Sequence, residues 1–445
     1  MNRFVEDKYM NNAALNKNDT STEYDVIIIG AGPAGLAAAV GAHEAGAGSI
    51  LVIDREKYPG GILQQCIHPG FGLKKFKKEL TGPEYAHAYI EMAKKKNIYL
   101  ALDTFVYSIS EDKNILISNT SDGLKNIKAG AVVMAMGCRE GTRGSISIPG
   151  FRPAGIFTAG TAQRLINIDG LMVGKKIIIL GSGDIGLIMA RRCTIEGVKV
   201  EAVIEKMPYP GGLNKNIVQC IDDFNIPLLL SHTVTFIDGK ERVRGVEIAG
   251  TCGNGEILDS KRKYIECDTL LLSIGLVPEN ELSRGAGIPL DPITGGPFID
   301  NMMHTQRQGF FAGGNVVQVY DLVDYVSEDS YTAGFNAGLY VQDKLDTAGD
   351  KIIIESGRYI RSIAPNILRI GDRRPVKDQK PVLSIRVEKP LTNSIRLSLS
   401  SENGSIADIK RPYAVPSEMI RLDLSKYSGK LAGEKKIRVD IEEAY

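Results

Sequence analysis

The sequence has few cysteines and keeps them apart. Six occur in 445 residues, and no two have the CxxC spacing of a zinc ligand pair or a thioredoxin-like dithiol. None follows Cys267, so the last part of the chain supplies no thiolate for an iron–sulfur cluster. We therefore expect no metal site, and this cysteine usage is typical of a protein of the reducing cytoplasm.

Long apolar runs and an excess of one charge are also missing. No run reaches the roughly 18 to 20 apolar residues that span a bilayer. Residues 1–23 lack the apolar segment of a secretory signal, so we expect a disordered leader there. Lys and Arg number 54 against 53 Asp and Glu, a net charge of +1, which gives no indication of binding to nucleic acid or to a membrane surface.

What the sequence does contain is one unit that occurs twice, 151 residues apart. YDVIIIGAGPAGL begins at Tyr24, and KKIIILGSGDIG begins at Lys175. Each copy places an acidic residue 24 positions after its first glycine, at the end of a second apolar run. The corresponding pairs are Gly30 and Gly181, Gly32 and Gly183, Gly35 and Gly186, and Asp54 and Glu205.

Each copy predicts a strand, a glycine turn and a helix that together bind a dinucleotide. The β-branched runs are typical of buried parallel strands. The first glycine permits a tight turn, the second lets the backbone approach a pyrophosphate, and the third lets helix and strand pack closely. The phosphates lie at the helix N-terminus, and the acid accepts hydrogen bonds from ribose hydroxyls. We expect two such sites; the alternative is one working site and one degenerate copy.

Four motifs follow one another along the chain, namely GAGPAGL, VVMAMGCRE (132–140), LLLSIGLVPENEL (270–282) and GFFAGGNV (309–316). In this order they resemble the motifs of two-dinucleotide-binding flavoprotein oxidoreductases. The resemblance implies FAD in the first copy and NAD(P)H in the second. It also implies an α/β fold with two Rossmann-like three-layer domains of the pyridine nucleotide-disulfide oxidoreductase type. A small C-terminal β domain would be added to them here.

The resemblance implies a division into domains and a set of site residues. The FAD-binding domain would comprise residues 24–150 and 276–350, and the NAD(P)-binding domain residues 151–275. The residues expected at FAD are Gly30, Gly32, Pro33, Ala34, Gly35, Asp54, Arg55, Gly61, Val106, Gly137, Gly314 and Asn315. Those expected at the nicotinamide nucleotide are Gly181, Gly183, Asp184, Ile185, Gly186 and Glu205.

Two of these residues bear on which nucleotide binds and how. The family usually has Asp where Asn315 stands; the amide still bonds ribityl hydroxyls but carries no charge. The carboxylate of Glu205 repels a 2′-phosphate and bonds a free ribose, so NAD(H) is expected rather than NADP(H), although Lys206 stands beside it.

A closer resemblance is carried by GGILQQCIHPGFG (60–72), LTGPEYA (80–86) and GNVVQVYDLVDYVSE (314–328). These stretches look like those of the flavoprotein found beside anaerobic glycerol-3-phosphate dehydrogenases, and of the larger subunits of opine oxidases and hydrogen cyanide synthases. The resemblance implies electron transfer between a nicotinamide nucleotide and a partner dehydrogenase through FAD. Two alternatives stay open: a self-sufficient NADH oxidase, peroxidase or disulfide reductase that uses Cys66, and a flavin-holding scaffold subunit or homo-oligomer without turnover.

The stretch at 60–72 contains Cys66 and His68, the candidate catalytic residues. In the family, this part of the chain runs beside the flavin ring. Cys66 is then either a wall of the flavin pocket or a redox thiol, and His68 either a structural histidine or a proton carrier. Residues 321–345 predict a helix that Asp324 or Ser327 caps, and by resemblance its N-terminus faces the flavin.

The last part of the chain, residues 352–445, has a different pattern. Apolar and polar residues alternate at 383–388, 394–400, 419–425 and 435–442, which predicts half-buried antiparallel strands. The segment has no His or Cys and no evident chemistry. We expect a small β domain that serves as an interface, to another copy or to a partner; the alternative is a passive cap on the core.

Overall fold

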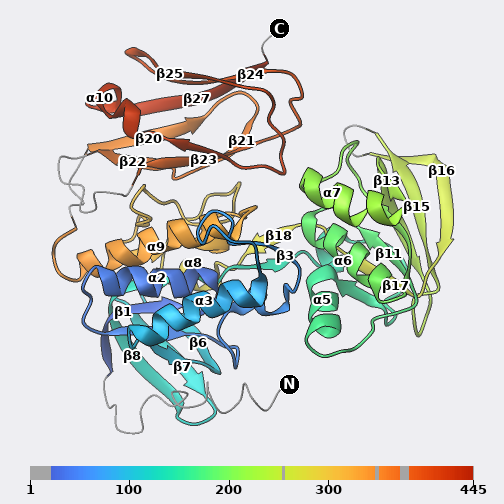
Figure 1. The fold of residues 1–445 in the computed structure, drawn as a ribbon, viewed down its shortest axis with the longest axis horizontal. Helices are drawn as coiled ribbons and strands as arrows, with labels where there is room; N and C mark the ends of the chain where they lie inside the picture. Colours follow the sequence, from blue (N-terminus) through green and yellow to red (C-terminus); the bar gives the residue numbers. More distant parts are fainter. Residues whose placement is uncertain (1–21, 253–255, 346–349, 371–379, 444–445) are drawn as a thin grey trace. The chain divides into compact units, whose positions relative to one another are not determined.

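The structure, a computed structural model, describes residues 22–252, 256–345, 350–370 and 380–443. The chain forms two compact units, one from the residues up to Cys138 and from Pro278 onwards, the other from Arg139 to Val277 (Figure 1). The first strand begins at Glu23, inside the predicted leader, and residues 1–21 of that leader lie outside the described residues. Within the described ranges, no helix is long and apolar enough to cross a membrane.

A parallel sheet forms the centre of the first unit. Its strands are β5 (Tyr99–Ala101), β2 (Ile50–Ile53), β1 (Glu23–Ile29) and β8 (Gly123–Met134), with β19 (Phe310–Ala312) paired to β8. An antiparallel ribbon of β6 (Thr104–Ile109) and β7 (Asn114–Asn119) extends from β8. Helices α2 (Pro33–Glu44), α3 (Gly82–Lys95) and α9 (Val323–Tyr340) lie together on one side of the sheet (Figure 1).

Helices α2 and α9 pack closely because small residues line their contact. A Cβ on Gly334 would lie 1.8 Å from the Ala38 carbonyl oxygen, and one on Gly338 would lie 2.8 Å from that of Ala42. The matching order of these contacts shows that the two helices run in the same direction. Because α2 follows β1, both helix N-termini point to the carboxyl edge of the sheet.

The start of α9 differs from the prediction. The helix begins at Val323 after Leu322, and no side chain caps it. Asp324 accepts a hydrogen bond from the Lys75 backbone N–H at 3.0 Å, and the Ser327 hydroxyl accepts one from the Tyr85 hydroxyl at 2.9 Å. Capping by Asp324 or Ser327 is therefore wrong, because tertiary contacts engage both side chains inside the helix.

The second unit has the same plan. Its parallel sheet is β10 (Ile156–Thr158), β17 (Thr269–Leu272), β11 (Lys176–Leu180), β12 (Lys199–Ile204) and β13 (Leu228–Leu229). It also contains an antiparallel sheet of β14 (His232–Asp238), β15 (Gly245–Thr251) and β16 (Ile257–Glu266), with helices α5 (Ala159–Asn167), α6 (Asp184–Ile195) and α7 (Asn214–Cys220). Along β11, Ile177 and Ile179 pack on the helix side, whereas Ile178 and Leu180 pack with β14 and β15. Both units therefore have the predicted three layers.

The second unit begins earlier than the predicted residue 151. The segment before that residue is tied to β14 by two backbone hydrogen bonds, from Ile237 N–H to the Pro149 carbonyl and from Phe151 N–H to the Ile237 carbonyl, each at 3.0 Å. The Arg143 side chain donates to the carbonyls of Ile148 and Gly150 at 2.8 and 3.1 Å. Residues 139–150 thus fold with the second unit and not with the first.

Residues 350–443, here called the tail, form two packed sheets within the first unit. One is β22 (Ile367–Ile370), β20 (Asp350–Ser356), β27 (Lys436–Glu443), β24 (Ile395–Ser401) and β25 (Gly404–Arg411). The other is β21 (Ile360–Ala364), β23 (Val382–Val387) and β26 (Ile420–Asp423). Strands lie at all four predicted segments, but β27 pairs with β20 in parallel. Because the tail has an apolar core of its own, we propose that it is a separate domain.

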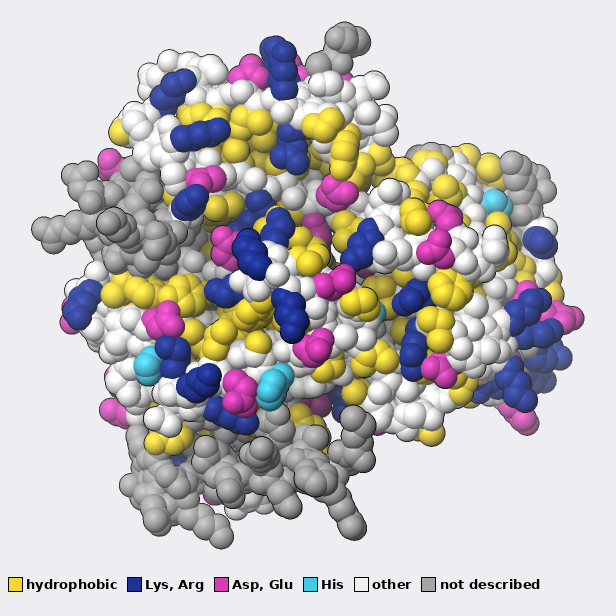
Figure 2. Space-filling view, in the orientation of Figure 1, with side chains coloured by type: hydrophobic (Ala, Val, Ile, Leu, Met, Phe, Trp, Pro, Cys, Tyr) yellow, Lys and Arg dark blue, Asp and Glu magenta, His cyan; other side chains and the backbone are white. Residues whose placement is uncertain are grey.

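The surface drawn in Figure 2 carries both signs of charge. Lys and Arg side chains lie among Asp and Glu and among apolar side chains on this face. This mixture agrees with the net charge of +1.

Candidate dinucleotide sites

The first glycine turn lies where β1 ends, and two of its glycines are required by the fold. Gly30 has a φ of +109°, and a Cβ there would lie 2.3 Å from the Ala135 carbonyl oxygen. A Cβ on Gly35 would lie 1.7 Å from the Gly30 carbonyl oxygen. Any side chain at these two positions collides with backbone, so their glycines are explained without a ligand.

Gly32 is different, because the protein itself leaves room for a side chain there. Its φ of −74° suits any residue, and a Cβ would meet only the Gly61 Cα, at 4.0 Å. Gly61 in turn has a φ of +55°, and its own Cβ would lie 2.9 Å from the Gly32 Cα. The open space at Gly32 fits the close approach of a pyrophosphate.

The helix N-terminus beside this space offers hydrogen-bond donors. Gly32 is the N-cap of α2, Pro33 opens the helix and has no N–H, and the first intrahelical bond runs from Leu36 N–H to the Gly32 carbonyl at 3.0 Å. The amides of Ala34 and Gly35 therefore face the space in front of the helix. They are placed to bind an anion, and the helix dipole favours negative charge there.

The second copy repeats this arrangement. Gly181 has a φ of +100°, and a Cβ there would lie 2.0 Å from the Ser273 carbonyl oxygen; one on Gly186 would lie 2.6 Å from the Gly181 carbonyl oxygen. At Gly183 a Cβ would find its nearest neighbour, the Ser273 hydroxyl, at 3.6 Å. The middle glycine is again the one that only a ligand explains.

The start of α6 presents the amides of Asp184 and Ile185 in the same way. The first intrahelical bond comes from Leu187 N–H to the Gly183 carbonyl at 3.1 Å. The Asp184 carboxylate accepts from Leu213 N–H at 2.8 Å and from the Asn216 amide at 2.6 Å. Asp184 thus contributes a backbone amide to the turn and uses its side chain to hold the neighbouring loop.

Asp54 follows β2 and is bonded to the glycine turn. Its Oδ2 accepts from Ala31 N–H at 2.5 Å, and its Oδ1 accepts from Glu56 N–H at 2.8 Å. Burial raises the pKa of this carboxyl, and the two backbone donors oppose the rise. Arg55 points elsewhere, to Glu279 at 3.5 Å. Asp54 is therefore positioned at the turn, whereas the Arg55 side chain is engaged in an exposed ion pair.

Glu205 reproduces this pattern in the second unit. Its Oε2 accepts from Ser182 N–H at 3.0 Å and from the Ser182 hydroxyl at 2.6 Å, and its Oε1 accepts from Met207 N–H at 2.9 Å. The Ser182 hydroxyl also accepts from Gly211 N–H at 2.8 Å. Ser182 stands where the first copy has Ala31, and the glycine motif alone does not single it out; aligning the two copies beyond their glycines would find it.

The late motif closes the first site. A Cβ on Gly314, whose φ is +76°, would lie 2.7 Å from the Ala34 Cβ, so the motif packs directly on the start of α2. Asn315 accepts from Tyr320 N–H at 3.1 Å and donates to the Cys138 sulfur at 3.4 Å. Gly137 has a φ of +74° and open space where a Cβ would be. The structure thus brings the ends of β1, β8 and β19 together at one edge.

Val106 is the predicted site residue with a different role. It is buried on β6, paired with Ile117 and packed in the core of the first unit. The start of β6 does lie beside the acid, since Thr104 N–H donates to the Asp54 carbonyl at 2.9 Å. The Val106 side chain itself serves packing.

Cys66 and His68 follow a short 3₁₀ helix, η2 (Gly61–Gln65). The Cys66 thiol donates to the Ile62 carbonyl at 3.3 Å, and burial raises its pKa to about 12. The His68 ring lies 3.1 Å, through Nδ1, from the Pro69 carbonyl and stacks at a tilt on Phe71. A thiol held protonated is a poor nucleophile, so this geometry favours the pocket wall over the redox thiol.

A comparison with known proteins places these sites in a family. Residues 24–330 match the family described as pyridine nucleotide-disulphide oxidoreductase. The A chain of opine oxidase from Agrobacterium tumefaciens (strain Ach5) is 25% identical over 328 residues, which cover 67% of this chain and 62% of that protein. The thioredoxin reductase of Bacillus subtilis (strain 168) is 27% identical over 306 residues, which cover 66% of this chain and 86% of that protein.

Two further matches extend the comparison. Hydrogen cyanide synthase subunit HcnB of Pseudomonas protegens is 21% identical over 286 residues, which cover 59% of this chain and 58% of that protein. The crystal structure of T. acidophilum thioredoxin reductase superposes with a TM-score of 0.59 at 24% identity, and covers 73% of this chain and 99% of that one. The chain spans about three fifths of the length of the opine oxidase and hydrogen cyanide synthase subunits.

These matches agree with the geometry of the two turns. The family binds FAD and NAD(P)H, and the residues around Gly32 and Gly183 leave the space and present the donors that such nucleotides need. The expected resemblance to opine oxidase and hydrogen cyanide synthase subunits is confirmed. The chain belongs to the pyridine nucleotide-disulphide oxidoreductases, a family of FAD-dependent NAD(P)H oxidoreductases.

Proposed function

We propose that the chain is an electron-transfer subunit that connects a nicotinamide nucleotide with a partner dehydrogenase. The observation that carries the proposal is the pair of ligand-shaped turns at Gly32 and Gly183, found in a chain without a CxxC dithiol. When bound, FAD and the nicotinamide nucleotide supply the hydride chemistry. The protein orients the two nucleotides through the amides at the starts of α2 and α6 and the carboxylates of Asp54 and Glu205.

The alternative of a self-sufficient peroxidase or disulfide reductase has less support. Disulfide reduction needs two thiols that exchange, and the attacking group is a thiolate. Cys66 has no cysteine neighbour in sequence, and its raised pKa of about 12 keeps the thiol protonated at neutral pH. The bonded position of the thiol on the Ile62 carbonyl is that of a wall residue.

NADH is the proposed nucleotide of the second site. Glu205 directs a carboxylate to the turn, where it would repel a 2′-phosphate and accept from a free ribose hydroxyl. The hydrogen bonds from Ser182 and Met207 fix both oxygens of that carboxylate. The only basic side chain next to it in sequence is Lys206.

The partner is proposed from the names of the relatives and from the tail. The opine oxidase and hydrogen cyanide synthase relatives are both named as subunits. The resemblance of residues 60–72 and 314–328 makes glycerol-3-phosphate dehydrogenase the first partner to test. The tail, which has no His or Cys, is the proposed contact surface. A cytoplasmic site of action is proposed as well, since all six cysteines lie in the described residues and each is a thiol.

The decisive experiment is anaerobic stopped-flow reduction of the FAD-loaded chain, followed by mixing with acceptors. We expect rapid reduction by NADH, slower reduction by NADPH at equal low concentration, and reoxidation by an artificial dye but not by peroxide or disulfides. Flavin that neither nucleotide reduces would point to the scaffold alternative. Rapid turnover of peroxide or a disulfide would point to the Cys66 enzyme. Co-expression with a glycerol-3-phosphate dehydrogenase then tests the partner by co-elution.

A further inference from the structure

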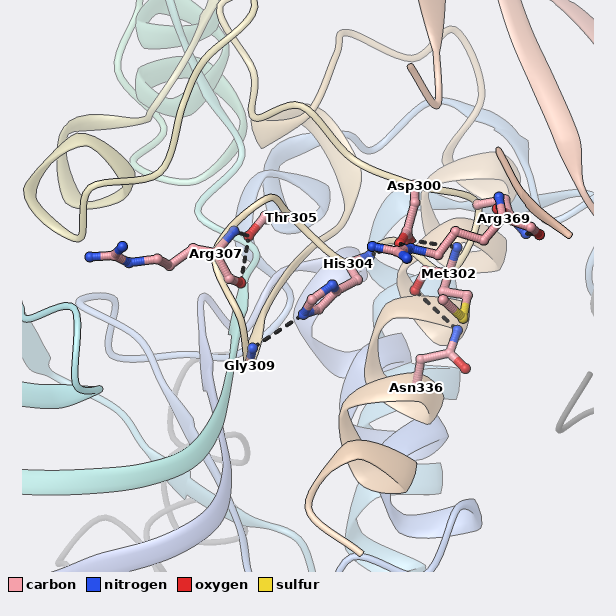
Figure 3. Close-up of polar contacts among 9 residues, drawn as sticks. Asp300, Met302, His304, Thr305, Arg307, Gly309, Asn336 and Arg369 are labelled. Atoms are coloured by element: carbon pink, nitrogen blue, oxygen red, sulfur yellow. Dashed lines mark hydrogen bonds and ion pairs between the residues drawn. The ribbon is translucent and has the colours of Figure 1, made fainter. Parts of the chain in front are cut away.

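The tail is joined to the flavin-binding part of the first unit through buried ion pairs. Arg369 on β22 donates through Nε to Asp300 at 2.6 Å, and the side chains are 13% and 3% exposed (Figure 3). Asp300 also accepts from the backbone of Met302 and His304 at 2.9 and 3.1 Å. A carboxylate so deeply buried needs its arginine, so this contact attaches the tail firmly.

A second pair lies closer to the flavin segment. Arg421 on β26 binds both oxygens of Asp329, at 2.7 and 2.9 Å, and its guanidinium lies 4.6 Å from the centre of the Tyr325 ring. The Tyr320 hydroxyl donates to the same carboxylate at 2.7 Å. Asp329 and Tyr325 belong to the first turns of α9, so one arginine of the tail contacts two sites on that helix.

A third pair holds the stretch just before α9. Arg386 on β23 forms an ion pair with Asp321 and donates to the Val319 carbonyl at 3.0 Å. Asp321 also accepts from the backbone N–H of Met419 on the tail. Both side chains of the ion pair are largely buried, with exposed fractions of 17% and 9%. The loop between the late glycine motif and α9 is thereby fixed to the tail at two points.

These contacts lead back to the site residue Asn315. The backbone N–H of Tyr320 donates to the side-chain oxygen of Asn315 at 3.1 Å. A continuous path of contacts therefore runs from Arg421 through Asp329 and Tyr320 to Asn315. Charged pairs taken out of water gain little net stability, but their fork geometry fixes position.

We propose that Arg386 and Arg421 of the tail are positioning residues for the flavin, holding residues 315–329 in the conformation that binds FAD. The inference rests on the proposed function, since it assumes FAD in the first site. It gives the tail a role in cofactor binding besides the proposed contact with a partner.

The test compares full-length variants in FAD binding. Arg421→Gln leaves Asp329 without its fork, and Arg421→Lys retains the charge but not the two parallel bonds. Arg396→Gln is the matched control, since it removes an arginine of the tail that pairs with Asp408 at 3.4 Å on the surface. Each protein is titrated with FAD, its flavin circular dichroism is recorded, and its thermal unfolding is measured without FAD.

We expect Arg421→Gln to raise the Kd for FAD at least about tenfold, equivalent to about 1.4 kcal/mol, with a changed flavin dichroism. Arg421→Lys should give a smaller rise and Arg396→Gln none. If Arg421→Gln does not fold, Tyr320→Phe replaces it, because it removes only the bond to Asp329 and should also weaken FAD binding. Wild-type affinity and dichroism in the folded variants would overturn the proposal, even with a lower unfolding temperature. A wild-type chain that binds no FAD would overturn the proposed function too.

Discussion

Replacing Gly32 with alanine should release FAD and leave the fold intact. The residue has a φ of −74°, and a Cβ would find only the Gly61 Cα, at 4.0 Å, so the protein accommodates a methyl group. As a change at a helix N-cap, it should cost up to about 1 kcal/mol of stability. The methyl group instead enters the space in front of the α2 amides, where a pyrophosphate approaches. We expect the Kd for FAD to rise at least about tenfold, or about 1.4 kcal/mol.

The matched control is Gly30→Ala, two residues away in the same turn. Its Cβ would lie 2.3 Å from the Ala135 carbonyl oxygen at a φ of +109°, so this variant should lose several kcal/mol, on the order of 4, and bind no FAD because it unfolds. Thermal unfolding with and without FAD separates the two cases. At a hundredfold excess over Kd, FAD should stabilise the wild type by about 2.7 kcal/mol. A Gly32→Ala chain that gains the same stabilisation would refute the reasoning.

Three further predictions concern other sites. Gly183→Ala should keep FAD but raise, at least about tenfold, the NADH concentration for half-maximal flavin reduction; unchanged stopped-flow kinetics would contradict this. Cys66→Ser should retain NADH-dependent dye reduction within about tenfold, or about 1.4 kcal/mol of barrier, and a larger loss would indicate a redox thiol. Burial lowers the pKa of His304 from 6.5 to about 4, so the unfolded chain binds more protons between these values. Stability should therefore fall by up to about 3 kcal/mol as the pH drops through this window, and denaturant unfolding of His304→Gln, which accepts from Gly309 in place of Nε2 but does not titrate, should show a flatter dependence. Equal pH profiles of the two proteins would exclude His304 as the cause.

The internal repeat is the most informative feature of the sequence, and it predicts more than the two folds. Positions 151 residues apart share not only glycines but also hydrogen bonds: Asp54 accepts from Ala31 and Glu56, and Glu205 from Ser182 and Met207. The reason is local, because strand, turn and acid lie within about 25 residues and constrain one another. The roles of Gly32 and Gly183 cannot be told from those of their neighbours by sequence, since all are glycine.

What the sequence could not predict depends on contacts between distant segments. The tail strands are visible from their alternation, but the pairing of Arg386 with Asp321 and of Arg421 with Asp329 joins residues 65 and 92 positions apart. The wrong caps of α9 have the same origin. Asp324 and Ser327 are good capping residue types, but here they bond Lys75 and Tyr85, which local sequence does not reveal.

The packing of Gly314 on Ala34 makes the two copies of the repeat unequal in how long they should retain a nucleotide. In the first unit, the late motif lies against the start of α2, and residues 315–329 that follow it are tied down by the tail. At the corresponding point of α6, the described contacts are with the short loop that Asp184 holds. We expect slow dissociation from the first copy and rapid exchange from the second. One duplicated unit would thus serve as a permanent holder of its nucleotide, and the other as a site that is filled and emptied at each turnover.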